Sequence, residues 1–189
     1  MTTTLTSDDK TLILRNAKPG DGAAYIALGW SAEIHRMFGG SRTTPEDDRR
    51  KVAADWLRSV RAHPFAWVIE HQGRLIGQIR LHSINNTDRN ARLSLGILTE
   101  DRLGQGIGRR TIKLVLAHAF GEMDLHRVDL RVLEFNTRAI RCYRSCGFVE
   151  EGRERQSACI RGVFYDDVMM GVLAHEFHAL KRAAPDREH

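Results

Sequence analysis

Apolar and polar positions follow two regular patterns along the chain, and together they predict its elements. Val128, Leu130 and Val132 alternate with polar residues, which predicts a strand over 127–133. Shorter apolar runs bounded by turn residues predict the other strands. These cover residues 11–15, 65–70, 75–84, 92–98, 148–150 and 162–173. A tight turn at 71–74 makes a hairpin of the second and third of these strands.

Helical spacing is clearest after residue 108. The apolar face of that helix consists of Ile112, Val115, Leu116, Ala119 and Phe120. Further helices are predicted over 21–29, 44–63 and 137–146. Thr44 as N-cap and Pro45 at the first helical position begin the 44–63 helix, and Gly147 ends the 137–146 helix.

The remaining segments lack a clear period. Residues 30–41, which contain the Gly39-Gly40 pair, predict an irregular loop. The first ten residues and those from Lys181 onward are polar and predict frayed ends. Antiparallel strands followed by a strand-helix-strand unit predict a mixed α/β fold. We expect one domain over 1–189, with its core at about 11–174.

Charge and cysteine content narrow the function classes. The net charge is +5, from 29 basic and 24 acidic residues, so an anionic partner is expected. The longest basic run, Arg49–Lys51, is too short for a nucleic-acid-binding arm. Three cysteines without a CxxC motif argue against a disulfide framework or a zinc site. His175 and His178 are one residue too close for an HExxH motif, so no metal is expected.

The N-terminal residues and the hydropathy pattern predict where in the cell the protein resides. The N-terminus has neither the basic nor the apolar region of a signal peptide. No stretch approaches the 18 apolar residues that a membrane span requires. We therefore expect a cytoplasmic protein without a membrane partner.

Three glycines, Gly104, Gly106 and Gly108, stand between a predicted strand and the strong helix. Small residues let backbone N–H groups converge at a helix N-terminus, which favours a phosphate or pyrophosphate. The spacing matches neither a Walker A loop nor a dinucleotide fingerprint. A tight turn without a ligand is the alternative interpretation. Upstream, Gly96 interrupts the strand pattern and indicates a bulge or a close backbone approach.

A second motif follows the glycine loop. Asn136, Ala139, Tyr143, Gly147 and Phe148 fit the pattern N-x-x-A-x-x-x-Y-x-x-x-G-F. Together with the glycine loop, this sequence resembles the GNAT superfamily of acetyl-CoA-dependent N-acetyltransferases. The resemblance implies a mostly antiparallel central sheet flanked by helices, with a splayed strand pair forming the acetyl-CoA slot. Leu103 departs from the polar residue usual at the start of the family's loop.

The resemblance also implies roles for individual residues in direct acetyl transfer from acetyl-CoA to an amine. The residues expected to hold the pyrophosphate through backbone amides are Leu103, Gly104, Gln105, Gly106, Ile107, Gly108 and Arg109. Ile97 and Leu98 would lie along the pantetheine arm, and a bulge near Gly96 would splay the strand. Asn136 would line the slot, and Tyr143 would protonate the departing thiolate. As alternatives, Asn136 is only an N-cap and Tyr143 an ordinary core residue.

A general base is harder to assign, because the acceptor ammonium has a pKa of about 10. Glu33 is named as the catalytic candidate. The other residues considered are His35, Glu100 and Glu134. Cys142 and Cys146 lack an acidic or basic neighbour in sequence and are interpreted as packing residues.

The C-terminal segment suggests an acceptor class. Residues 151–153 and 162–170 resemble the branch that includes ribosomal-protein N-terminal, polyamine and antibiotic acetyltransferases. The acceptor is then a primary amine of a small molecule or a protein N-terminus. Asp166 and Asp167 would suit a cationic amine. The alternatives are a non-catalytic acyl-CoA-binding sensor and, from net charge alone, a nucleic-acid-binding domain. A homodimer is compatible with the sequence.

Overall fold

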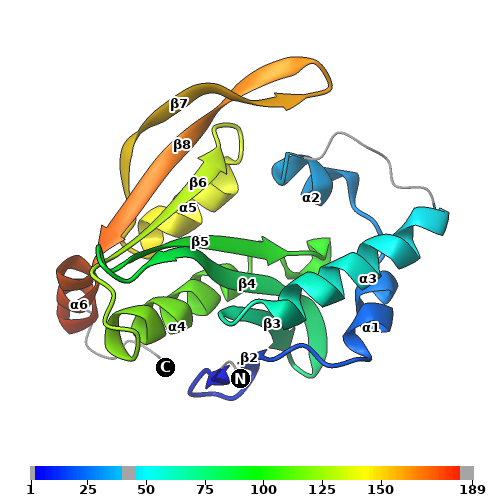
Figure 1. Cartoon of the computed structure of the whole chain (residues 1–189), viewed down its shortest axis with the longest axis horizontal. Helices are drawn as coiled ribbons and strands as arrows, with labels where there is room; N and C mark the ends of the chain where they lie inside the picture. The colour runs from blue at the N-terminus through cyan, green and yellow to red at the C-terminus, as the bar shows by residue number, and fades with distance from the viewer. Residues whose placement is uncertain (1–2, 40–45, 184–189) are drawn as a thin grey trace.

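The computed structural model describes residues 3–39 and 46–183 and contains an open eight-stranded sheet (Figure 1). Its strands are β1 (Leu5–Thr6), β2 (Leu12–Arg15), β3 (Ala66–His71), β4 (Arg74–Asn85), β5 (Asn90–Ile97), β6 (Arg127–Leu133), β7 (Val149–Ile160) and β8 (Val163–Leu173). Their spatial order is β1-β2-β3-β4-β5-β6-β8-β7, and only the β5–β6 pair is parallel among the described strands. The predicted mixed α/β, mostly antiparallel fold is confirmed.

Helices flank both faces of this sheet. They are α1 (Asp21–Ala27), α2 (Ala32–Met37), α3 (Glu46–Ala62), α4 (Ile107–Gly121), α5 (Thr137–Ser145) and α6 (Ala174–Ala183), with a 3-10 turn η1 at Glu100–Arg102. On β3, Trp67 and Ile69 point into the larger core, to which α4 contributes its apolar face. Val68, between them, packs with Trp56 of α3 in a smaller core on the opposite face. Alternation along one strand therefore separates the two layers.

The centre of the sheet is split. Strand β5 pairs with β6 only where Asn90–Arg92 lie beside Arg127–Asp129. Beyond that point β6 continues along β8, with Leu133 opposite Asp167, while β5 stays with β4. The predicted splayed strand pair is thus present.

The predicted bulge at Gly96 is wrong. The structure instead has the alternative, a close approach of the β4 and β5 backbones at this position. The register runs without a shift from Gly77 opposite Ile97 to Ile79 opposite Leu95. A Cβ added to Gly77 would lie 2.0 Å from the Gly96 carbonyl oxygen. A Cβ on Gly96 would lie 3.0 Å from Cζ of Phe38. Divergence of β5 from β6, not an inserted residue, opens the sheet.

Several elements differ from the sequence predictions. Within the first ten residues, which were expected to be frayed, β1 pairs Leu5 with Leu14 of β2. Helix α2 lies within the segment predicted as irregular, with the Ser31 side chain accepting a hydrogen bond from Ile34 N. Helix α6 continues to Ala183, beyond the predicted frayed start at Lys181. The predicted cap at Thr44, Pro45 and Gly40 lie outside the described residues.

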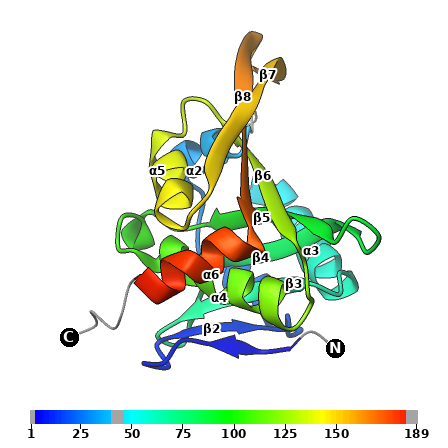
Figure 2. The same cartoon turned by 90° about the vertical axis from the view of Figure 1, so that its left-hand side faces the viewer.

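Strand β7 is the largest of these differences, since only residues 148–150 were predicted as strand there. It runs over Val149–Ile160 and is exposed along most of its length. With β8 it forms a long arm that extends away from the rest of the sheet (Figures 1 and 2). A strand exposed on both faces carries no apolar alternation, so the pattern could not predict it.

Candidate active site

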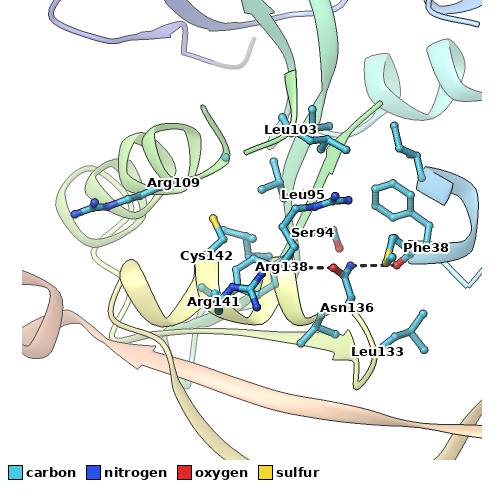
Figure 3. Close-up of a pocket in the computed structure, with 18 of the residues that line it drawn as sticks. Phe38, Ser94, Leu95, Leu103, Arg109, Leu133, Asn136, Arg138, Arg141 and Cys142 are labelled. Atoms are coloured by element: carbon cyan, nitrogen blue, oxygen red, sulfur yellow. Dashed lines mark hydrogen bonds between the residues drawn. The ribbon is translucent and has the colours of Figure 1, made fainter. Parts of the chain in front are cut away.

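A cavity of about 670 Å³ lies where β5 and β6 diverge. The predicted site residues that line it are Ile97, Leu103, Gly104, Gly106, Ile107, Gly108, Arg109, Asn136 and Tyr143. Three others are not in its lining. Leu98 N donates to Ile76 O at 2.8 Å, Gln105 is exposed with its side chain bonded to Asp101 O, and Glu33 is exposed on α2. The two sequence motifs thus meet around one cavity (Figure 3).

The glycine loop presents free backbone donors at one end of this cavity. Gly104 and Gly106 have φ of 75° and 74°, a conformation that favours glycine. The first amide bonded within α4 is Arg110 N, which donates to Gly106 O at 3.1 Å. The amides of Ile107, Gly108 and Arg109 therefore have no acceptor within the helix, and the positive end of its dipole faces the same way. This arrangement fits a pyrophosphate.

Asn136 joins two walls of the cavity. Its Oδ1 accepts a hydrogen bond from Ala139 N at 3.2 Å, which caps α5. Its Nδ2 donates to Met37 O at the end of α2, at 3.5 Å. In Figure 3 a dashed line joins Asn136 to the segment that carries Phe38. Asn136 is therefore an N-cap, as one interpretation predicted, and it also lines the cavity and bonds to the end of α2.

Tyr143 comes from the buried face of α5. Its ring packs edge-to-face against Phe148, with ring centroids 5.8 Å apart. Burial, followed by the neighbouring thiols of Cys142 and Cys146, raises the pKa of Tyr143 well above its usual 10. The phenol therefore stays protonated across the physiological range and is available as a proton donor.

Cys142 and Cys146 have a charged neighbour that their sequence context does not reveal. Cys142 is half-buried in the cavity wall, and hydrogen bonding with Cys146, together with the charge of Arg109, lowers its pKa. Cys146 is buried, and its Sγ lies 3.7 Å from Arg109 O. The two thiols hold α5 against the start of α4, close to the glycine loop.

None of the four candidate bases belongs to the cavity lining that the described residues form. Glu33 pairs with Arg138 at 3.2 Å, and its side chain is 52% exposed. His35 packs against Trp30, and burial lowers its pKa. Glu100 accepts a hydrogen bond from Ser31, and Glu134 accepts one from Asp166 N at 3.1 Å.

Polar residues on one face of β4 and β5 line the cavity and were missed by the sequence analysis. Arg80 lies opposite Ser94, and His82 lies opposite Arg92. His82 Nε2 is 2.9 Å from Ser94 Oγ, and burial followed by the charges of Arg80 and Arg92 lowers the pKa of His82 from 6.5. The sequence feature that could have revealed them is their strict alternation with apolar residues. That alternation is equally typical of a strand face exposed to solvent.

Comparison with known proteins gives a consistent result. Residues 11–149 match the acetyltransferase (GNAT) domain family. A spermidine N(1)-acetyltransferase of Vibrio cholerae is 33% identical over 110 residues, 58% of this chain and 63% of the relative. A putative ribosomal N-acetyltransferase of Bacillus subtilis is 26% identical over 146 residues, 77% of this chain and 79% of the relative. The chain thus covers less than two thirds of the spermidine acetyltransferase.

Solved structures agree with the sequence comparison. The crystal structure of spermidine N-acetyltransferase from Vibrio cholerae in complex with CoA and spermine superposes with a TM-score of 0.72 at 27% identity. That superposition covers 89% of this chain and 98% of the other. Another solved structure, a putative acetyltransferase, has a TM-score of 0.80 at 22% identity, covering 96% and 92% of the two chains. In the part of the chain that the structure describes, no helix is both long and apolar enough to cross a membrane.

Proposed function

The chain belongs to the GNAT acetyltransferase family, and from this premise we propose that it transfers an acetyl group from acetyl-CoA directly to a primary amine. The observation that carries the proposal is the cavity between β5 and β6, which has free helix-terminal amides at one end and the Tyr143 side chain in its wall. Direct transfer needs a site that binds both substrates at once, and a cavity of about 670 Å³ is large enough for the reacting ends of two ligands.

In this proposal the glycine loop binds the pyrophosphate of acetyl-CoA. The amides of Ile107, Gly108 and Arg109 would donate to its oxygens, and the Arg109 guanidinium would add charge. A Cβ on Gly108 would lie 3.6 Å from both Cys142 Sγ and Leu95 Cδ2. These are ordinary van der Waals distances, so the start of α4 packs against both α5 and β5 at this position. Gln105 would contribute only its backbone, since its side chain is turned to Asp101.

The splayed edge of β5 would bind the pantetheine arm. Residues 93–97 have no pairing with β6, so the backbone groups on that side of β5 are free among the described strands. Ile97 lines the cavity, whereas Leu98 would border the arm outside it. A β5 amide would also polarise the thioester carbonyl, which stabilises negative charge developing on its oxygen.

Tyr143 would act as the general acid that protonates the leaving thiolate. A phenol with a raised pKa is a weak donor in water. The proton transfer remains feasible here because burial raises the pKa of a thiol as well as that of a phenol. Phe148 keeps the ring oriented through its edge-to-face contact.

We assign the role of proton acceptor to His82 rather than to Glu33. His82 lines the cavity and is neutral at pH 7, since its pKa is below 6.5. Its contact with Ser94 Oγ offers a path for the acceptor's proton. Glu33 is held by Arg138 outside the cavity lining, so its role in this proposal is to position Arg138.

An acetyl-CoA consumption screen against polyamines, aminoglycosides, amino acids and short peptides tests the proposal. We expect acetyl-CoA-dependent modification of at least one amine class, with release of free CoA. The competing hypothesis, a non-catalytic acyl-CoA-binding sensor, gains if acetyl-CoA binds but no amine in the panel is acetylated. We expect no metal requirement, so EDTA should leave the rate unchanged.

Domain organisation, assembly and location are also proposals. We propose that residues 1–189 form one acetyltransferase domain, which the continuous sheet from β1 to β7 supports. We propose a homodimer that uses the β7–β8 arm, where Val163 and Phe164 are 52% and 59% exposed. Light scattering of the wild type and of Phe164→Ser tests this assembly. A cytoplasmic location agrees with the three free cysteines.

A further inference from the structure

The cavity is strongly cationic beyond what a pyrophosphate site requires. The arginines that line it, among the described residues, are Arg80, Arg92, Arg102, Arg109, Arg131, Arg138 and Arg141. Asp167 is the one acidic residue in that described lining, and its Oδ2 already accepts a hydrogen bond from Ser157 Oγ at 3.1 Å. The predicted acidic acceptor site of Asp166 and Asp167 therefore does not set the charge of the cavity.

Most arginines on the inner wall have a carboxylate partner. Arg92 Nε lies 2.6 Å from Asp129, and Arg131 lies 3.1 Å from Glu154. Arg80 is different. It is half-buried, its Nε is inaccessible to solvent and has no hydrogen-bond partner, and no carboxylate among residues 3–39 and 48–183 forms an ion pair with it. Burying part of a guanidinium without a counter-charge is unfavourable, so an anionic ligand group would be stabilised there.

Arg80 is also well separated from the glycine loop. It lies opposite Ser94, and Ile97 at the end of β5 is three positions further along the chain, a distance of about 10 Å on an extended strand. Arg102 and Arg109 lie beyond that end, next to the loop. A pyrophosphate bound by the loop therefore leaves Arg80 free to contact the second substrate.

We propose that the acceptor amine carries an oxyanion, a carboxylate or a phosphate, and that Arg80 binds this group. The inference rests on the acetyl transfer proposed above and specifies its acceptor. A guanidinium forms two parallel hydrogen bonds with a carboxylate or a phosphate, which fixes the orientation of the ligand. The amine of the same molecule would then reach toward His82 and Ser94, which lie on the same face as Arg80.

The same geometry disfavours a polyamine. A spermidine-like acceptor would bring several positive charges beside Arg80 and Arg92, with Asp129 already paired to Arg92. Like charges in a partly desolvated site repel more strongly than they do in bulk water. The relatives named for spermidine therefore share the fold with this chain, but the described cavity has the charge suited to a different acceptor.

Matched acceptors test the inference. The full-length protein is assayed with acetyl-CoA and an α-amino acid, the corresponding amino-acid amide, phosphoethanolamine or spermidine. We expect kcat/KM, expressed per concentration of unprotonated amine, to be at least about tenfold higher for the amino acid than for its amide, since the amide lacks the charged carboxylate. The ranking of the amino acid against phosphoethanolamine identifies which oxyanion is preferred. Equal rates for acid and amide, or a preference for spermidine, would overturn the inference.

Variants of Arg80 test whether this residue causes the preference for the amino acid over its amide. Arg80→Gln should reduce the preference for the amino acid over its amide to within about twofold, and Arg80→Lys should retain part of it. Arg58→Gln is the matched control, because the Arg58 side chain is 76% exposed on α3. Affinity for acetyl-CoA should stay within about twofold in all three variants, which shows that they are folded. An unchanged preference in Arg80→Gln would remove Arg80 from the proposal.

A protein that lacks the proposed acetyl transfer can be distinguished from one that lacks the proposed oxyanion site. If the wild type acetylates none of the four amines, calorimetric titration of the CoA complex with the same compounds decides the inference separately. Tighter binding of the amino acid than of its amide, lost in Arg80→Gln, would support an oxyanion site in a protein without the proposed activity. Equal binding of the two, or tighter binding of spermidine, would overturn it.

Discussion

The ring of Phe38 rests on Gly96, so closely that a Cβ atom at Gly96 would lie 3.0 Å from Phe38 Cζ. This contact brings the end of α2 against the splayed part of β5. On its other side α2 is held by Asn136, whose Nδ2 donates to Met37 O. The cavity is therefore enclosed by a short helix that bridges the two halves of the split sheet.

Gly96→Ala should displace the Phe38 ring and open this wall. Because Phe38 is 54% exposed, its ring can move, and we expect the loss of stability to stay below about 1 kcal/mol. Affinity for acetyl-CoA should fall about fivefold, the equivalent of about 1 kcal/mol. The double variant Gly96→Ala/Phe38→Ala relieves the clash and should recover part of the affinity. An additive loss in the double variant would show that the contact does not matter.

Gly77→Ala should be far more damaging than Gly96→Ala. Its Cβ would lie 2.0 Å from the backbone oxygen of Gly96, so β4 and β5 would have to separate locally. We expect the free energy of unfolding to fall by about 2–4 kcal/mol in urea denaturation. Gly20→Ala is the control, since nothing lies within 4 Å of its Cβ position and φ is −69°, and its effect should stay within about 0.5 kcal/mol. Similar losses in the two variants would contradict this close approach.

The sequence predicted the elements whose side chains alternate between core and solvent. Strand 127–133 was predicted with the bounds that β6 has, and Gly147 adopts the expected positive φ of 97° after α5. Helix α2 could not be predicted, because its six residues are too few to show a period and it depends on contacts from Asn136 and Gly96. Strand β7 lacked an apolar face.

The candidate site likewise contains residues that the sequence predicted and residues that it did not. The glycine loop and the Tyr143 motif were visible because their residues are contiguous and their spacing is distinctive. The inner wall was not, because Arg80 and His82 become site residues only when β6 turns away from β5. Residues on an alternating polar face carry no signal that separates a cavity wall from a solvated surface.

Asp21 should control acid stability. Its carboxylate is buried, which opposes ionisation, but hydrogen bonds from Arg15 and Lys18 N outweigh this effect and lower its pKa below 3.8. A lowered folded-state pKa stabilises the protein above the unfolded pKa, and this contribution is lost as the pH falls below about 4. Asp21→Asn should therefore cost about 3 kcal/mol at pH 7, and the difference from wild type should shrink toward pH 3. A difference independent of pH in urea denaturation would contradict this role.

His82 should set the acid limb of the pH–rate profile. Burial, followed by the charges of Arg80, Arg92 and His63, lowers its pKa below 6.5, while Asp129 opposes the shift. A base must be neutral to accept a proton, so kcat/KM should rise with pH through this lowered pKa and level off above about 6.5. His82→Gln should lower the rate and remove that limb, whereas Glu33→Gln should retain it. Loss of the limb in Glu33→Gln alone would reassign the base to Glu33.

Tyr143→Phe tests the central claim most directly. The measurement is the rate of acetylated amine formation, followed by mass spectrometry, for wild type and variant at saturating acetyl-CoA, together with the acetyl-CoA Kd of each. The ring and its packing on Phe148 are kept, and only the buried hydroxyl is removed. If Tyr143 protonates the leaving thiolate, kcat should fall by about 10²-fold or more while Kd stays within about twofold. An unchanged kcat, or a wild type that binds acetyl-CoA without acetylating any amine, would contradict the account.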